Sequence, residues 1–175
     1  GKLFSALGSD SNAFTSHDQT VYYGTAERNK LKALLTLEAD RMQNAVIDTE
    51  QLNSEKRVVI SELKGYENSP EYRLNRAVMQ AVFPNHPYGL PVAGTEQDVE
   101  KFTLEQVKQY YQNFYSPDNA VLVIVGDIET NKTLEAVKEI FGKIPANKNI
   151  RSKDRVIENI NNHIKKDVSN FSKPI

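Results

Sequence analysis

The feature that most limits the fold is the segment NAVLVIVGD at residues 119–127, in which six consecutive residues are apolar. An unbroken apolar run of this length is typical of a β-strand that is buried on both faces. A β-hairpin is predicted near the start of the chain. There SNAFTS and TVYYGTA are rich in aromatic and β-branched residues, and a polar turn separates them. The chain is therefore expected to contain a sheet.

Most of the remaining chain has apolar residues at helical spacing. The predicted helices cover residues 30–46, a region from an N-cap at Asp48 or Thr49 through residues 54–70, and residues 69–83, 103–115 and 131–145. Residues 83–94 are rich in proline and glycine and are predicted to form a loop. These elements predict an α+β fold, a two-layer sandwich of a mostly antiparallel sheet packed against helices.

Composition excludes several kinds of partner. The chain has 175 residues and a net charge of -1, so it carries no signal for nucleic acid or for an acidic membrane surface. No apolar run is long enough to span a bilayer. The absence of cysteine excludes disulfides and thiolate metal sites. The start, GKLFSALGS, shows neither Met nor a secretory pattern, which predicts a soluble fragment or processed product whose compartment stays open.

Two glutamates, Glu55 and Glu62, stand seven residues apart in a predicted helix. They share a helix face and are separated along the axis by roughly 10 Å. A carboxylate oxygen binds zinc at about 2 Å, so the two groups cannot easily hold the same ion. One carboxylate is therefore a candidate ligand and the other a candidate support for a ligand. The alternative is an ordinary charged face with Lys56, Arg57 and Lys64 as neighbours.

Several ordered segments resemble the zinc metallopeptidases of the pitrilysin and insulinase family, which includes the mitochondrial processing peptidases. The similar segments are GSDSNAFTSHDQTVYY, LEADRMQNAVID, SEKRVVISEL, HPYGLPVAGTEQDVEKFT, YYQNFYSPDNAVLVIVGD and IFGKIP, in the order of the family. The resemblance covers residues 1–145 and implies a metallopeptidase-like N-terminal domain that is truncated at its own N-terminus. Residues 146–175 form a polar tail without such resemblance, and a helix, a linker and disorder all remain open for it.

The resemblance implies a zinc site to which this chain contributes one ligand. In the family, two histidines of a His-x-x-Glu-His motif bind zinc, the glutamate of the motif is the general base, and a downstream glutamate is the third ligand. Glu62 matches that third ligand, and Glu55 matches the glutamate that supports the site. The motif precedes the ligand by about 75 residues, which places it roughly a dozen residues before Gly1. The chain is therefore expected to bind zinc only if the upstream histidines are supplied, and to be inactive alone.

The three histidines in the chain are not expected to replace the missing motif. His17 lies in the hairpin turn, His86 in the loop and His163 in the tail, and their spacing indicates no common site. A catalytic zinc ion normally needs three protein ligands.

The hairpin is the candidate substrate site, because an extended peptide can add to an exposed strand edge by main-chain hydrogen bonds. The resemblance implies this role for Asn12, Ala13, Phe14 and Thr15. In the alternative interpretation Asn12 only closes a turn and Phe14 packs in the core. Packing is the preferred interpretation for Phe14, because aromatic residues usually contribute by burial.

The function that follows is a zinc-dependent metalloendopeptidase domain that acts on peptides together with a homologous second domain or partner subunit. The first alternative is a non-catalytic partner or substrate-binding subunit of the same family. The second is a generic α+β interaction domain, which would require all the ordered motifs to be coincidental.

Overall fold

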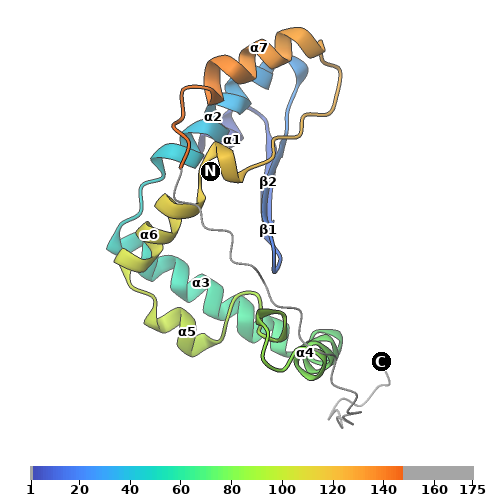
Figure 1. The fold of residues 1–175 in the computed structure, drawn as a ribbon, viewed down its shortest axis with the longest axis vertical. Helices are drawn as coiled ribbons and strands as arrows, with labels where there is room; N and C mark the ends of the chain where they lie inside the picture. Colours follow the sequence, from blue (N-terminus) through green and yellow to red (C-terminus); the bar gives the residue numbers. More distant parts are fainter. Residues whose placement is uncertain (1, 148–175) are drawn as a thin grey trace. The chain divides into compact units, whose positions relative to one another are not determined.

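The computed structural model describes residues 2–147. Within this range the chain forms two compact units. Unit 1 comprises residues 2–14, 20–47 and 105–147, and unit 2 comprises residues 15–19 and 48–104. The described residues form helices and one two-stranded sheet, so the α+β class is confirmed (Figure 1).

Unit 1 contains the hairpin and the helices at both ends of the described chain (Figure 1). Its elements are α1 (Lys2–Ala6), β1 (Asp10–Thr15), β2 (Thr20–Thr25), η1 (Arg28–Lys30), α2 (Leu31–Asn44), α6 (Leu104–Phe114), η3 (Pro117–Asn119) and α7 (Thr130–Phe141). The predicted hairpin is confirmed, and the N–H of Ser16 closes its turn by donating to the carbonyl of Gln19 at 2.8 Å. The predicted helices at 30–46, 103–115 and 131–145 are also confirmed.

The core of unit 1 lies along α2, which buries Leu35 and Ala39. These residues are four apart, so they occupy the same face of the helix. Helix α2 packs beside α7 in Figure 1, and Lys32 forms an ion pair with Glu139 of α7 at 2.8 Å.

A tyrosine hydroxyl closes the C-terminal end of α2. Tyr111 of α6 donates to the carbonyl oxygen of Arg41 at 2.7 Å and accepts the N–H of Ala45 at 3.0 Å. The last carbonyls of a helix have no intrahelical partner, so the Tyr111 hydroxyl satisfies one of them and also fixes the first residue beyond the helix. The side chain of Arg41 lies over the rings of Tyr22 and Phe4, with its guanidinium carbon 4.3 and 5.2 Å from the ring centroids. These contacts connect β2, α1, α2 and α6.

Unit 2 is built from α3 (Thr49–Glu67), α4 (Pro70–Val82), η2 (Pro87–Gly89) and α5 (Glu96–Lys101). Of the two residues predicted as the N-cap of α3, Asp48 and Thr49, the structure has Asp48, whose carboxylate accepts the N–H of Gln51 at 2.8 Å. Helix α4 begins at Pro70, as predicted. Helices α3 and α5 pack together and contribute the buried side chains Leu63 and Val99.

The strand predicted at residues 119–127 is wrong for the described part of the chain. Residues 120–125 form no helix or strand, and Val121, Val123 and Val125 are exposed instead of buried. A strand needs a neighbour whose backbone groups complete its hydrogen bonds. Residues 2–147 provide no such neighbour, so the sheet within this range is the hairpin alone.

Two short helices were not predicted. Helix α1 lies in the segment whose pattern gave no assignment, and α5 lies just beyond the proline-rich loop. The start of α5 carries a capping box, in which Thr95 accepts the N–H of Asp98 and Asp98 accepts the N–H of Thr95. This Thr-x-x-Asp spacing is a sequence signal for a helix N-terminus. Among residues 2–147, no helix has the length and apolar character needed to cross a membrane.

Candidate functional site

Glu55 and Glu62 lie on α3 of unit 2, and both side chains are exposed. Neither carboxylate forms a hydrogen bond or ion pair with any residue in the described range. The two lysines of α3 that are close to these glutamates in sequence contact α5 instead. Lys56 donates to the backbone carbonyl of Glu100 at 2.9 Å, and Lys64 pairs with Glu96 of α5 at 2.7 Å.

The ion pair between Lys64 and Glu96 changes the pKa of the lysine. The hydrogen bond to Glu96, and after it the charge of Glu96, raises the pKa of Lys64 above its ordinary value. The two α3 glutamates thus remain free carboxylates on a helix whose nearby lysines are directed to α5. An ordinary salt-bridged helix face would instead neutralise them.

The described residues alone do not supply enough ligands for a zinc ion. Residues 2–147 contain no group of three or more side chains of the kinds that hold a metal. Zinc in a catalytic site takes three protein ligands, and Glu62 is one carboxylate. Any metal bound at Glu62 therefore needs ligands from beyond this range.

Both described histidines lie against the same tyrosine in unit 2. The rings of His17 and His86 are 5.2 and 4.6 Å from the ring of Tyr88, measured between centroids. His86 accepts the N–H of Tyr88 on Nδ1 at 3.1 Å, and Nε2 of His17 lies 3.3 Å from the carbonyl oxygen of Leu90. Tyr88 also donates its hydroxyl to Asp18 at 2.6 Å. The cluster anchors the hairpin turn to the η2 loop, which is a structural role. His163 lies outside the described residues.

The candidate substrate strand is β1 of the hairpin, because one edge of β1 pairs with β2 and the sheet has no third strand in the described residues. Asn12, Ala13, Phe14 and Thr15 are all exposed. The expected burial of Phe14 is wrong: its side chain is 52% exposed. Asn12 Oδ1 accepts the N–H of Ala13 at 2.8 Å, which leaves the Asn12 side-chain NH₂ as an available donor.

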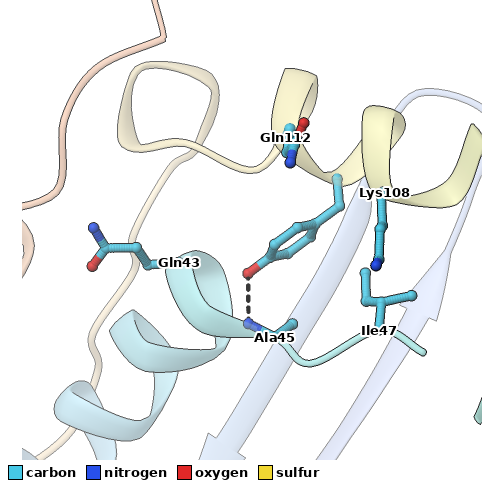
Figure 2. A pocket seen from close by; sticks show the side chains of 6 residues that line it. Gln43, Ala45, Ile47, Lys108 and Gln112 are labelled. Carbon is cyan, nitrogen blue, oxygen red and sulfur yellow. Dashed lines mark hydrogen bonds between the residues drawn. The ribbon is translucent and has the colours of Figure 1, made fainter. Parts of the chain in front are cut away.

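The hollow in Figure 2 was not predicted from the sequence. It has a volume of about 300 Å³ and is open to solvent, and it lies in unit 1 between the end of α2 and α6. Its lining residues are Gln43, Ala45, Ile47, Lys108, Tyr111 and Gln112. The dashed line in Figure 2 is the hydrogen bond from Ala45 N–H to the tyrosine hydroxyl. None of these residues forms a nucleophile–base pair or metal cluster, so the hollow carries no catalytic assignment.

The fold and the sequence together define the class of protein. The family described as insulinase, peptidase family M16, matches residues 2–96, and the family described as peptidase M16 inactive domain matches residues 101–173. The chain therefore belongs to the insulinase (M16) peptidase family. The second match extends through most of the tail that the sequence motifs left unassigned.

Curated relatives are named as zinc proteases. The uncharacterized zinc protease YmxG of Bacillus subtilis is 32% identical over 143 residues, which is 82% of this chain and 35% of that protein. A second protein of Bacillus subtilis, the uncharacterized zinc protease YmfH, is 31% identical over 142 residues, or 81% of this chain and 33% of that protein. The chain thus spans about a third of the length of these relatives.

Solved structures agree with this assignment. A protease from Helicobacter pylori matches with a TM-score of 0.78 and 28% identity, over 86% of this chain and 37% of that one. The first half of the periplasmic protease PqqL from Escherichia coli matches with a TM-score of 0.79 and 25% identity, over 90% of this chain and 35% of that one.

Proposed function

We propose that this chain is the part of a zinc metalloendopeptidase that binds the peptide substrate and contributes the metal-ligating carboxylate Glu62. The observation that carries the proposal is the state of Glu62, an exposed carboxylate with no partner among the described residues. A carboxylate of this kind costs little to bring to a metal, because no ion pair has to be broken first. The names of the curated relatives support zinc as that metal.

Glu55 is proposed to support the site from two helical turns earlier. Its position along α3 puts it on the same face as Glu62 but too far away for both to bind one ion. A carboxylate at that place is suited to accept the ring N–H of a histidine ligand, which fixes the orientation of the ring. This role does not require Glu55 to contact the metal.

The β1 strand is proposed to hold the substrate. A peptide added to the open edge of β1 would bind through its main chain, with little regard to its sequence. Asn12 is proposed to donate its side-chain NH₂ to a substrate carbonyl, while Ala13, Phe14 and Thr15 line the edge. The exposure of Phe14 supports a contact with substrate side chains, since an aromatic ring left half in solvent gains by being covered.

Catalysis is proposed to need the rest of a larger assembly. Two zinc ligands and the general base are expected from chain that the described residues do not include, so residues 2–147 alone are expected to bind peptides and not to cleave them. A homologous second half or partner subunit is proposed as well. The match to the first half of a periplasmic protease supports this arrangement.

The alternative is a non-catalytic partner of the same family that only holds substrate. The match of residues 101–173 to the M16 inactive domain favours this alternative. In that case the β1 edge keeps its role, and Glu62 is a free surface carboxylate without a metal.

A chimera tests the metal role directly. In the Bacillus subtilis protease YmxG, the matched 143-residue stretch is replaced by the corresponding stretch of this chain. Zinc content is then measured by mass spectrometry, and cleavage of a quenched fluorescent peptide gives activity. We expect about one zinc ion per chimera. Zinc should be lost in Glu62→Gln and retained in Glu50→Gln, which changes an exposed glutamate on a different face of α3.

Each outcome discriminates between the two functions. Zinc content that is equal in the Glu62→Gln and Glu50→Gln chimeras would refute Glu62 as a ligand. Retention of zinc with reduced activity in Glu55→Gln is the result expected of a supporting carboxylate. Circular dichroism spectra of all variants show whether a loss of zinc reflects unfolding instead.

A further inference from the structure

The turn that follows β1 is held by residues far along the chain. It contains His17 and Asp18 and lies in unit 2 together with the η2 loop. The hydroxyl of Tyr88 donates to Asp18 Oδ2 at 2.6 Å, and Nε2 of His17 lies 3.3 Å from the carbonyl oxygen of Leu90. Two adjacent residues of the turn are therefore attached to the η2 loop.

The contact between Tyr88 and Asp18 is the stronger of the two. A hydroxyl that donates to a carboxylate forms a shorter and stronger hydrogen bond than one between neutral groups, at about 2.5–2.7 Å. The observed length is within this range. Asp18 follows the last residue of β1, Thr15, by only three positions, so the bond restrains the backbone just beyond the end of the strand.

The η2 loop is a firm base for this contact, because it packs directly on the end of α4. The backbone N–H of Tyr88 donates to His86 Nδ1 at 3.1 Å, and the ring of Tyr88 meets the ring of Phe83 edge-on at 5.6 Å between centroids. At Gly89 a β-carbon would lie 2.1 Å from the carbonyl oxygen of Phe83, so only glycine allows this close approach. The position of the Tyr88 hydroxyl is therefore set by α4.

The place of the strand end matters to a peptide that pairs with β1. Such a peptide binds through main-chain hydrogen bonds, so the backbone of the strand must be ordered up to Thr15. If the end of the strand were loose, ordering it on binding would cost conformational entropy and weaken the complex. Thr15 also belongs to the same compact unit as Glu62, the proposed metal ligand.

We propose that Tyr88 is a positioning residue for the peptide substrate, which it serves by holding Asp18 and thereby the end of β1. Tyr88 acts through Asp18 and does not itself contact the peptide or the metal. The inference rests on the proposed function, because it takes β1 as the strand that binds the peptide.

Peptide affinity tests this role. Fluorescence anisotropy gives the Kd of the 175-residue chain for fluorescein-labelled β-casein, an unfolded chain, at a temperature well below the melting transition. Tyr88→Phe keeps the ring and removes the hydrogen bond, so it should weaken binding about three- to tenfold. Asp18→Ala should have the same effect, and the double variant should bind no more weakly than either single variant. Amide exchange of residues 15–19 should accelerate in all three.

A conservative variant and a matched control separate positioning from general stability. Asp18→Asn keeps an oxygen that can accept the Tyr88 hydroxyl, so its Kd should stay within about twofold of the unchanged chain. Tyr72→Phe is the control in the same unit, because the Tyr72 hydroxyl forms no hydrogen bond within residues 2–147 and its ring contact with Tyr66 is kept. A contact that only stabilises the fold would lower the Tm of Tyr88→Phe without changing its Kd.

Three results would overturn the inference. Equal Kd values for Tyr88→Phe and Tyr72→Phe would exclude the positioning role and leave the proposed function intact. Binding by Asp18→Asn as weak as that by Asp18→Ala would show that the hydrogen bond is not responsible. Absence of casein binding by the unchanged chain would refute the proposed role of β1, and the positioning role with it.

Discussion

The hydroxyl of Tyr111 gives a prediction whose magnitude follows from two hydrogen bonds. It donates to the carbonyl of Arg41 at 2.7 Å and accepts the N–H of Ala45 at 3.0 Å. A neutral hydrogen bond contributes about 0.5–1.5 kcal/mol net, and these groups are only partly buried. Tyr111→Phe keeps the ring and is therefore expected to lower the free energy of unfolding by about 1–2 kcal/mol.

Thermal melts followed by circular dichroism measure the loss. For a chain of this size, 1 kcal/mol corresponds to roughly 2–4 °C, so the expected decrease in Tm is roughly 2–8 °C. Amide exchange of Ala45 provides the local readout and should accelerate, because its acceptor is removed.

The neighbouring tyrosine supplies the control. Tyr110 is 61% exposed, and its hydroxyl has no hydrogen-bond partner among residues 2–147. Tyr110→Phe keeps the ring contact with Phe114 and should change the stability by no more than about 0.5 kcal/mol. Equal Tm values for the two variants, or unchanged exchange of Ala45 in Tyr111→Phe, would refute the capping role of Tyr111.

Other predictions concern the core, a helix cap and an ion pair. Leu35→Ala, at a side chain that is 3% exposed, should cost about 2–5 kcal/mol in urea unfolding, whereas Leu3→Ala, at 65% exposed, should have little effect. Thr95→Ala removes one half of a capping box and should cost about 1 kcal/mol in the same assay, and an unchanged midpoint would contradict that role. The hydrogen bond from Lys32, and then its charge, lowers the pKa of Glu139, so the pair stabilises the fold above the unfolded pKa and is lost as pH falls through the folded pKa. A carboxyl NMR titration should show Lys32→Met raising the pKa of Glu139, and an unshifted titration would rule out the pairing.

The elements that the sequence predicts correctly are those fixed by local interactions. Helix α3 begins where Asp48 can cap it, and α4 begins at Pro70, whose ring fixes the backbone in a helical conformation. The hairpin is likewise local, because its strands are joined by a short turn. Its tip also makes a long-range contact, in which Asp18 accepts the hydroxyl of Tyr88 seventy positions later. No spacing rule predicts that contact.

The candidate site, too, is only partly predictable from the sequence. Helical periodicity is enough to place Glu55 and Glu62 on one face of α3. It does not show that Lys56 and Lys64 are drawn to α5, because that depends on how two helices pack. The burial expected for Phe14 failed for a related reason. A ring in a strand becomes buried only when another layer covers that face, and the sequence of the strand alone does not provide the layer.

The strand expected at residues 119–127 and the proposed metal ligand Glu62 have one property in common. In each case the residues are suited to a partner that residues 2–147 do not contain. An apolar run of strand length is stable only when other strands take up its backbone groups, and a zinc-binding carboxylate needs further ligands. Local sequence therefore predicts a strand in one segment and a metal ligand in the other, but it does not identify the partner of either. The Glu62→Gln chimera tests the second partner, because it shows whether ligands from outside residues 2–147 hold zinc together with this carboxylate.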